Sequence, residues 1–152
     1  MIQRIQTVYL FVISLLFLLL FFVPFANFIV DNQIVAYTYQ GLGNGFQSTN
    51  GIIPAFPVII FIIIVFTVSF ISIFLYKKRL LQIKLGRINY IFIISLIIYV
   101  VLFIFRAKTL LNTEPNYSFG LLLPLISIIL NYLAIRAIRK DDNLIKSVDR
   151  IR

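Results

Sequence analysis

One long apolar run dominates the middle of the sequence: residues 52–79 read IIPAFPVIIFIIIVFTVSFISIFLYKKR. No charged residue interrupts the run before Lys77. About 20 apolar residues are enough for a helix to cross the hydrocarbon core of a bilayer. Pro54 and Pro57 lie in the first turns, where a helix tolerates proline because those N–H groups have no helical acceptor. The run therefore predicts a membrane-spanning helix over residues 52–76.

Similar apolar runs lie on both sides of this segment and predict spans over about 7–29, 88–105 and 119–137. The first run is also compatible with a signal peptide in which Arg4 is the basic residue, but its length favours a retained helix. Gly86 precedes the third run, where we expect it to end a helix. The sequence therefore predicts one domain, 1–152, that is an all-α membrane protein folded as an antiparallel four-helix bundle.

The composition agrees with a membrane location and argues against an enzyme. Hydrophobic residues make up 61% of the chain and charged residues only 12%, whereas a soluble domain has about a quarter charged residues. Cysteine and histidine are both absent, which removes thiolate nucleophiles, disulfides, and the commonest metal ligand and general base. We expect no catalytic residue, metal site or cofactor.

The basic residues are distributed very unevenly along the chain. Of the 14 Lys and Arg residues, only Arg106 and Lys108 fall in the predicted outer loop over 106–118. Arg4 precedes the first span, five lie in the loop over 77–87, Arg136 lies at the end of the fourth span, and the remaining five lie in the tail over 138–152. By the positive-inside rule, both termini and the 77–87 loop are expected in the cytoplasm. This arrangement explains the net charge of +9 as membrane flanks, so we expect a lipid bilayer and no nucleic acid as partner.

The outer loop over 30–51 has its own pattern. Strand-prone runs lie on both sides of Asp31-Asn32, a dipeptide compatible with the turn of a short β-hairpin. We expect Tyr37 and Tyr39 to pack on the end of the bundle, with a small recognition surface as the alternative.

The predicted spans contain few polar residues and no Asp, Glu, Lys or Arg in their middle portions. Intramembrane ionisable residues usually mark ion or proton pathways, so their absence argues against a proton-coupled transporter. Asn131 is the most notable polar residue, because its amide must find a partner in hydrocarbon. We expect an interhelical hydrogen bond there, and a ligand contact remains the alternative.

The two ends of the chain carry a resemblance to a known family. The opening MIQRIQT (1–7) and the ending IRKDD (138–142) with KSVDRIR (146–152) resemble an uncharacterised family of small bacterial inner-membrane proteins, catalogued as a domain of unknown function. The resemblance implies a four-pass protein of the bacterial inner membrane and supplies no activity. It suggests a cytoplasmic interaction surface whose candidate residues are Gln3, Arg4, Gln6, Asp141, Asp142, Asp149 and Arg150.

We expect the amino-terminal segment and the tail to meet at the inner mouth of the bundle, with Arg4 paired to Asp149 or Asp142. The function favoured by these features is a non-enzymatic accessory or structural subunit that binds other inner-membrane proteins or a second copy of itself. The alternative is a small oligomeric transporter or channel for a neutral or apolar solute.

Overall fold

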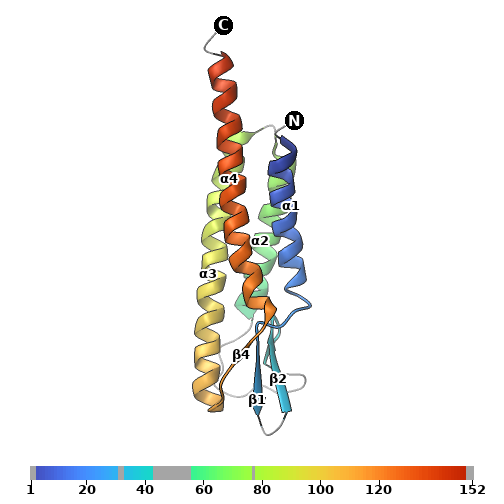
Figure 1. The fold of residues 1–152 in the computed structure, drawn as a ribbon, viewed down its shortest axis with the longest axis vertical. Coiled ribbons are helices and arrows are strands. Elements are labelled where there is room, and N and C mark those ends of the chain that lie inside the picture. Colours follow the sequence, from blue (N-terminus) through green and yellow to red (C-terminus); the bar gives the residue numbers. More distant parts are fainter. Residues whose placement is uncertain (1–2, 31–32, 43–55, 77, 150–152) are drawn as a thin grey trace.

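The computed structural model describes residues 3–30, 33–42, 56–76 and 78–149. Four long helices pack side by side in it (Figure 1): α1 (Gln3–Leu19), α2 (Phe56–Phe74), α3 (Arg79–Leu111) and α4 (Leu122–Asp149). Both α1 and α3 contact α2 as well as α4. The starts of α1 and α3 lie at the same end of the bundle as the last turns of α4, which project beyond them (Figure 1); we call this the charged end. A small sheet lies at the opposite end, the sheet end.

Three helical segments are long and apolar enough to cross a membrane: Phe56–Phe74, Arg79–Leu111 and Phe119–Leu144, the last including the short 3-10 helix η1 (Phe119–Leu121). The helix over Ile5–Leu19 is apolar but shorter. The first apolar run thus differs from the single span predicted over 7–29. Its helix ends at Leu19, and Ala26–Val30 forms strand β1. Pro24 cannot donate a backbone hydrogen bond, and Phe25 N–H donates to the carbonyl of Tyr37 instead, at 2.8 Å.

The sheet is antiparallel and has the strand order β3-β2-β1-β4. Strand β1 pairs with β2 (Gln33–Thr38) in a register that sets Ala26 opposite Tyr37. This pairing confirms the strands predicted on both sides of Asp31-Asn32, a dipeptide that itself lies outside the described residues. The sequence did not predict the short strands β3 (Gly41–Leu42) and β4 (Asn116–Tyr117). Because β4 pairs with β1, the segment before α4 is joined to the segment after α1.

The prediction that Gly86 ends a helix is wrong, and so is the loop expected over most of 77–87. Helix α3 begins at Arg79 and continues through Gly86 to Leu111, where Asn112 ends it in the left-handed conformation with φ 49°. Gly86 is buried against α4: a Cβ added there would lie 2.8 Å from Cγ1 of Ile135. The glycine therefore permits close approach of the two helices. Helix α4 likewise continues beyond the predicted boundary at 137, to Asp149.

The helices bury their polar side chains and expose large apolar ones. Ser69, Asn89, Ser127 and Asn131 are each no more than 1% exposed. Large apolar side chains on the outer faces of all four helices are about half exposed or more, including Phe11, Phe56, Ile63, Ile91, Phe105 and Ile129. Water disfavours contiguous apolar surface of this extent, whereas lipid accepts it. The distribution indicates a membrane protein.

Candidate functional site

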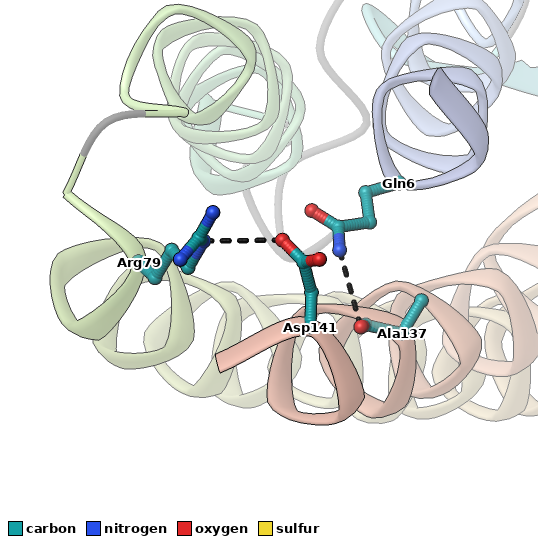
Figure 2. A network of polar contacts seen from close by, with 4 residues as sticks. All are labelled: Gln6, Arg79, Ala137 and Asp141. Atoms are coloured by element: carbon teal, nitrogen blue, oxygen red, sulfur yellow. Dashed lines mark hydrogen bonds and ion pairs between the residues drawn. The ribbon is translucent and has the colours of Figure 1, made fainter. Parts of the chain in front are cut away.

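The charged end holds a set of contacts between helices that are far apart in sequence. Gln6 on α1 is buried, and its Nε2 donates to the carbonyl oxygen of Ala137 on α4 at 3.1 Å (Figure 2). The two residues are 131 positions apart. This hydrogen bond joins the first helix of the chain to the last.

An ion pair lies beside this hydrogen bond. Nε of Arg79, the first residue of α3, is 3.1 Å from Oδ2 of Asp141 on α4 (Figure 2). The side chains are only 20% and 12% exposed, so the pair is screened less by solvent than a surface pair. Asp141 therefore pairs with a residue that the sequence analysis had assigned to a loop.

The other residues of the predicted interaction surface make neither of these two contacts. Asp142 follows Asp141 on α4 and lines a shallow pocket with Lys78 and Arg79 at the start of α3. Gln3, Arg4 and Asp149 belong to helices α1 and α4, but their side chains lie outside the described part. Arg150 lies outside the described residues altogether. The expected pairing of Arg4 with Asp149 or Asp142 therefore remains a prediction.

Two buried amides on α3 were missed by the sequence analysis. Nε2 of Gln82 donates to the carbonyl oxygen of Ser72 on α2 at 2.7 Å, and Nδ2 of Asn89 donates to Oγ of Ser69 at 2.9 Å. The signal was a spacing: positions 82, 86 and 89 lie on one face of a helix. That signal can be recognised only if the helix is known to begin before Gly86.

A further interhelical amide lies between α3 and α4. Nδ2 of Asn131, which is fully buried, donates to the carbonyl oxygen of Gly86 at 2.9 Å. By contrast, the hydroxyls of Ser72 and Ser127 donate to carbonyl oxygens of their own helices, four residues earlier. Amides thus connect the helices, while these two hydroxyls bond locally.

Each of these amides also has a buried oxygen without a hydrogen-bond partner among the described residues: Oε1 of Gln82, Oδ1 of Asn89 and Oδ1 of Asn131. A buried carbonyl oxygen that bonds to nothing carries a cost of about 1–3 kcal/mol. Between the charged end and the middle of the bundle, the helices therefore leave three buried hydrogen-bond acceptors unused. Within the described residues, no group of three or more Asp or Glu side chains could hold a metal ion.

Tyr37, for which a recognition surface was the alternative prediction, is fully buried at the sheet end. Its ring stacks on Phe103 of α3, with centroids 4.0 Å apart and planes 2° from parallel. Burial, and to a lesser degree the neighbouring Tyr99, raises the pKa of the Tyr37 hydroxyl far above its ordinary value. The packing therefore removes Tyr37 from any surface, while Tyr39 packs edge-on against Phe21.

Together these features define a class: a mostly helical protein with three long apolar helices, a small antiparallel sheet and buried polar contacts between its helices. Its family is also defined. The chain belongs to the family described as "Domain of unknown function (DUF4293)", whose model matches residues 2–151. Searches of curated proteins and of solved structures found no match.

Proposed function

We propose that this protein crosses the bacterial inner membrane four times, with both ends in the cytoplasm, and acts as a non-enzymatic accessory subunit that binds other inner-membrane proteins. The observation that carries the proposal is the arrangement of polar groups: buried amide N–H groups donate hydrogen bonds between helices, and basic side chains remain exposed at one end.

The packing of α1 supports a fourth crossing. Its 17 residues extend about 25 Å at 1.5 Å per residue, which is close to the hydrocarbon thickness of about 30 Å. It contacts α2 and α4 and turns Val8, Phe11 and Leu15 outward, each about half exposed. Such a face would be as unfavourable in water as those of the three longer helices.

The orientation follows from charge. Lys78, Lys84, Arg87, Arg139 and Lys140 lie on the charged-end portions of α3 and α4 or just before them. The described basic residues of the sheet end are Arg106 and Lys108, and Lys108 pairs with Glu114 at 2.7 Å. Because positively charged segments stay in the cytoplasm, the charged end is the cytoplasmic one.

The apolar interior supports a binding role rather than a conducting one. Phe17, Ile62, Leu96 and Phe103, one or more from each of α1, α2 and α3, are no more than 1% exposed. Side chains of this size fill the space between helices and leave the bundle to act through its surfaces. One observation favours the alternative, an oligomeric transporter or channel for a neutral solute: the three unpartnered amide oxygens between the charged end and the middle of the bundle could accept hydrogen bonds from water or a solute.

Because the chain has no cysteine, single-cysteine variants can test the four crossings directly. A maleimide that cannot cross the inner membrane should label Asn116→Cys, at the sheet end, in intact spheroplasts. It should label Ile5→Cys and Asn143→Cys only after permeabilisation. Protection of Asn143→Cys together with labelling of Ile5→Cys in intact spheroplasts would mean that α1 does not cross.

Affinity purification of the tagged full chain from native membranes tests the accessory role. A membrane protein should co-purify in stoichiometric amount with the wild type and with Arg106→Glu, an exposed control at the sheet end. It should be lost with Lys140→Glu at the charged end. If no variant retains a partner and the purified protein increases glycerol permeability of liposomes, the transporter alternative replaces this proposal.

A further inference from the structure

A groove of about 600 Å³ runs between α3 and α4 on the outside of the bundle. From α3 it is lined by Arg87, Tyr90 and Ile91, and from α4 by Tyr132, Ile135, Arg136 and Arg139. On each helix the lining positions recur after three and four residues (87 to 90 and 91; 132 to 135 and 136, then 139), so they form a continuous stripe. The groove is open to the surroundings: Ile91 is 63% and Tyr132 58% exposed.

The charge of the groove is strongly positive. Three of its seven lining residues are arginines, and none is acidic. The two ion pairs given above, Arg79–Asp141 and Lys108–Glu114, use none of the three groove arginines. Neighbouring guanidinium groups repel one another, and an anion placed between them relieves that repulsion. Phosphate suits them best, because the planar guanidinium donates two parallel hydrogen bonds to its oxygens.

The position of the groove along the helices defines the source of the anion. Arg87 is the last charged residue before the apolar part of α3, and Arg136 is the first after the apolar part of α4. The groove therefore spans the boundary between charged and apolar surface on both helices. Tyr90 and Tyr132 lie beside this boundary, where tyrosine commonly marks the headgroup level. A phospholipid has the same order of groups, with phosphate at the boundary and acyl chain below it.

We propose that this groove binds an anionic phospholipid, with Arg87, Arg136 and Arg139 on the phosphate and Ile91 and Ile135 against the start of an acyl chain. Basic pockets between membrane helices are suited to such headgroups. A zwitterionic lipid brings its own cation, which the three arginines oppose. The inference requires that the bundle lie in a membrane, but not that it bind another protein.

Native mass spectrometry of the detergent-purified full chain tests the proposal. The probes are phosphatidylglycerol and phosphatidylcholine with identical acyl chains. The wild type should retain phosphatidylglycerol in preference to phosphatidylcholine. R87Q/R136Q/R139Q should bind it about tenfold more weakly, the change expected from loss of even one charge-assisted hydrogen bond. K78Q/K84Q/K140Q removes the same charge from residues at the same end that do not line the groove. It should change binding less than about twofold, because charges that do not contact the phosphate act on it only through screened solvent.

A second variant distinguishes a loss of lipid binding from a folding defect. I91W adds bulk at a residue that is 63% exposed, so it fills the groove without altering the core or the charge. It should also reduce lipid retention. Equal retention of both lipids, equal losses in the arginine and lysine variants, or displacement of the lipid by inorganic phosphate at equal concentration would overturn the proposal. The last outcome would identify a soluble phosphate ligand instead.

Discussion

The two ends of the bundle are held together by different kinds of contact. At the sheet end, backbone groups connect distant segments: Ser118 N–H donates to the Phe25 carbonyl at 3.1 Å and Gly120 N–H to the Pro24 carbonyl at 3.2 Å. At the charged end, side chains form the connections, through Gln6, Gln82 and the Arg79–Asp141 pair. Most substitutions preserve backbone hydrogen bonds, whereas one substitution removes a side-chain contact. Substitutions should therefore destabilise the sheet end less than the charged end, except where a new side chain would displace the backbone.

The largest loss of stability is expected at Gly120 in the sheet end, where there is no space for a side chain. A Cβ on Gly120 would collide with the backbone carbonyl of Pro24, which cannot move without breaking the hydrogen bond between them. Gly120→Ala should destabilise the protein by about 3 kcal/mol or more, as steric overlap in a packed site does. Thermal unfolding of the purified protein in mild detergent measures this. An unchanged midpoint would show that the two segments are not held together as described.

The ion pair at the charged end should give the next largest effect. Asp141→Asn leaves the mostly buried Arg79 guanidinium without a carboxylate, and we expect a loss of about 2 kcal/mol, less than for a fully buried pair. The matched control at the sheet end is Glu114→Gln, which breaks a pair whose glutamate is 81% exposed. Pairs of that kind contribute about 0–1 kcal/mol. Equal losses at the two ends would contradict the difference between them.

Close packing of α3 on α4 gives a smaller effect, because the obstacle is a side chain. Gly86→Ala would place a methyl group 2.8 Å from Cγ1 of Ile135, and the isoleucine can shift. We expect a loss of about 1–2 kcal/mol in thermal unfolding. The double variant Gly86→Ala/Ile135→Ala should be less destabilised than the sum of the single variants. Strict additivity would show that the two residues do not interact.

The smallest effect is expected at Tyr37, whose buried hydroxyl has no hydrogen-bond partner among the described residues. Tyr37→Phe removes an unpaired polar group, so stability should stay equal or rise by about 1 kcal/mol. The folded-state pKa of Tyr37 is raised by burial. Its protonated form therefore contributes stability below the unfolded value of about pH 10, and this contribution is lost above it. Alkaline destabilisation should be weaker in Tyr37→Phe than in the wild type; an identical pH profile would exclude a contribution from this residue.

The sequence predicted the strands on both sides of Asp31-Asn32 and three long apolar segments, because both patterns are local. It did not predict that α3 begins at Arg79. Arg79, Gln82 and Lys84 fall in the range expected as a loop, yet they form the first turns of α3, which begins at Arg79 directly after Lys78. Two polar side chains of that helix, Gln82 and Arg79, have their partners on α2 and α4: the Ser72 carbonyl and Asp141. A hydropathy pattern carries no information about such partners.

The sequence by itself determined which segments are apolar enough for lipid and where the basic residues gather, because hydropathy and charge are sums over neighbouring residues. Only the tertiary structure decided that Asn131 meets Gly86, that Gln6 meets Ala137, and that three arginines of α3 and α4 share one groove. The physical reason is that each of these contacts depends on the rotation and relative height of two packed helices. Those quantities are set by side-chain packing over the whole bundle and by no single stretch of the chain.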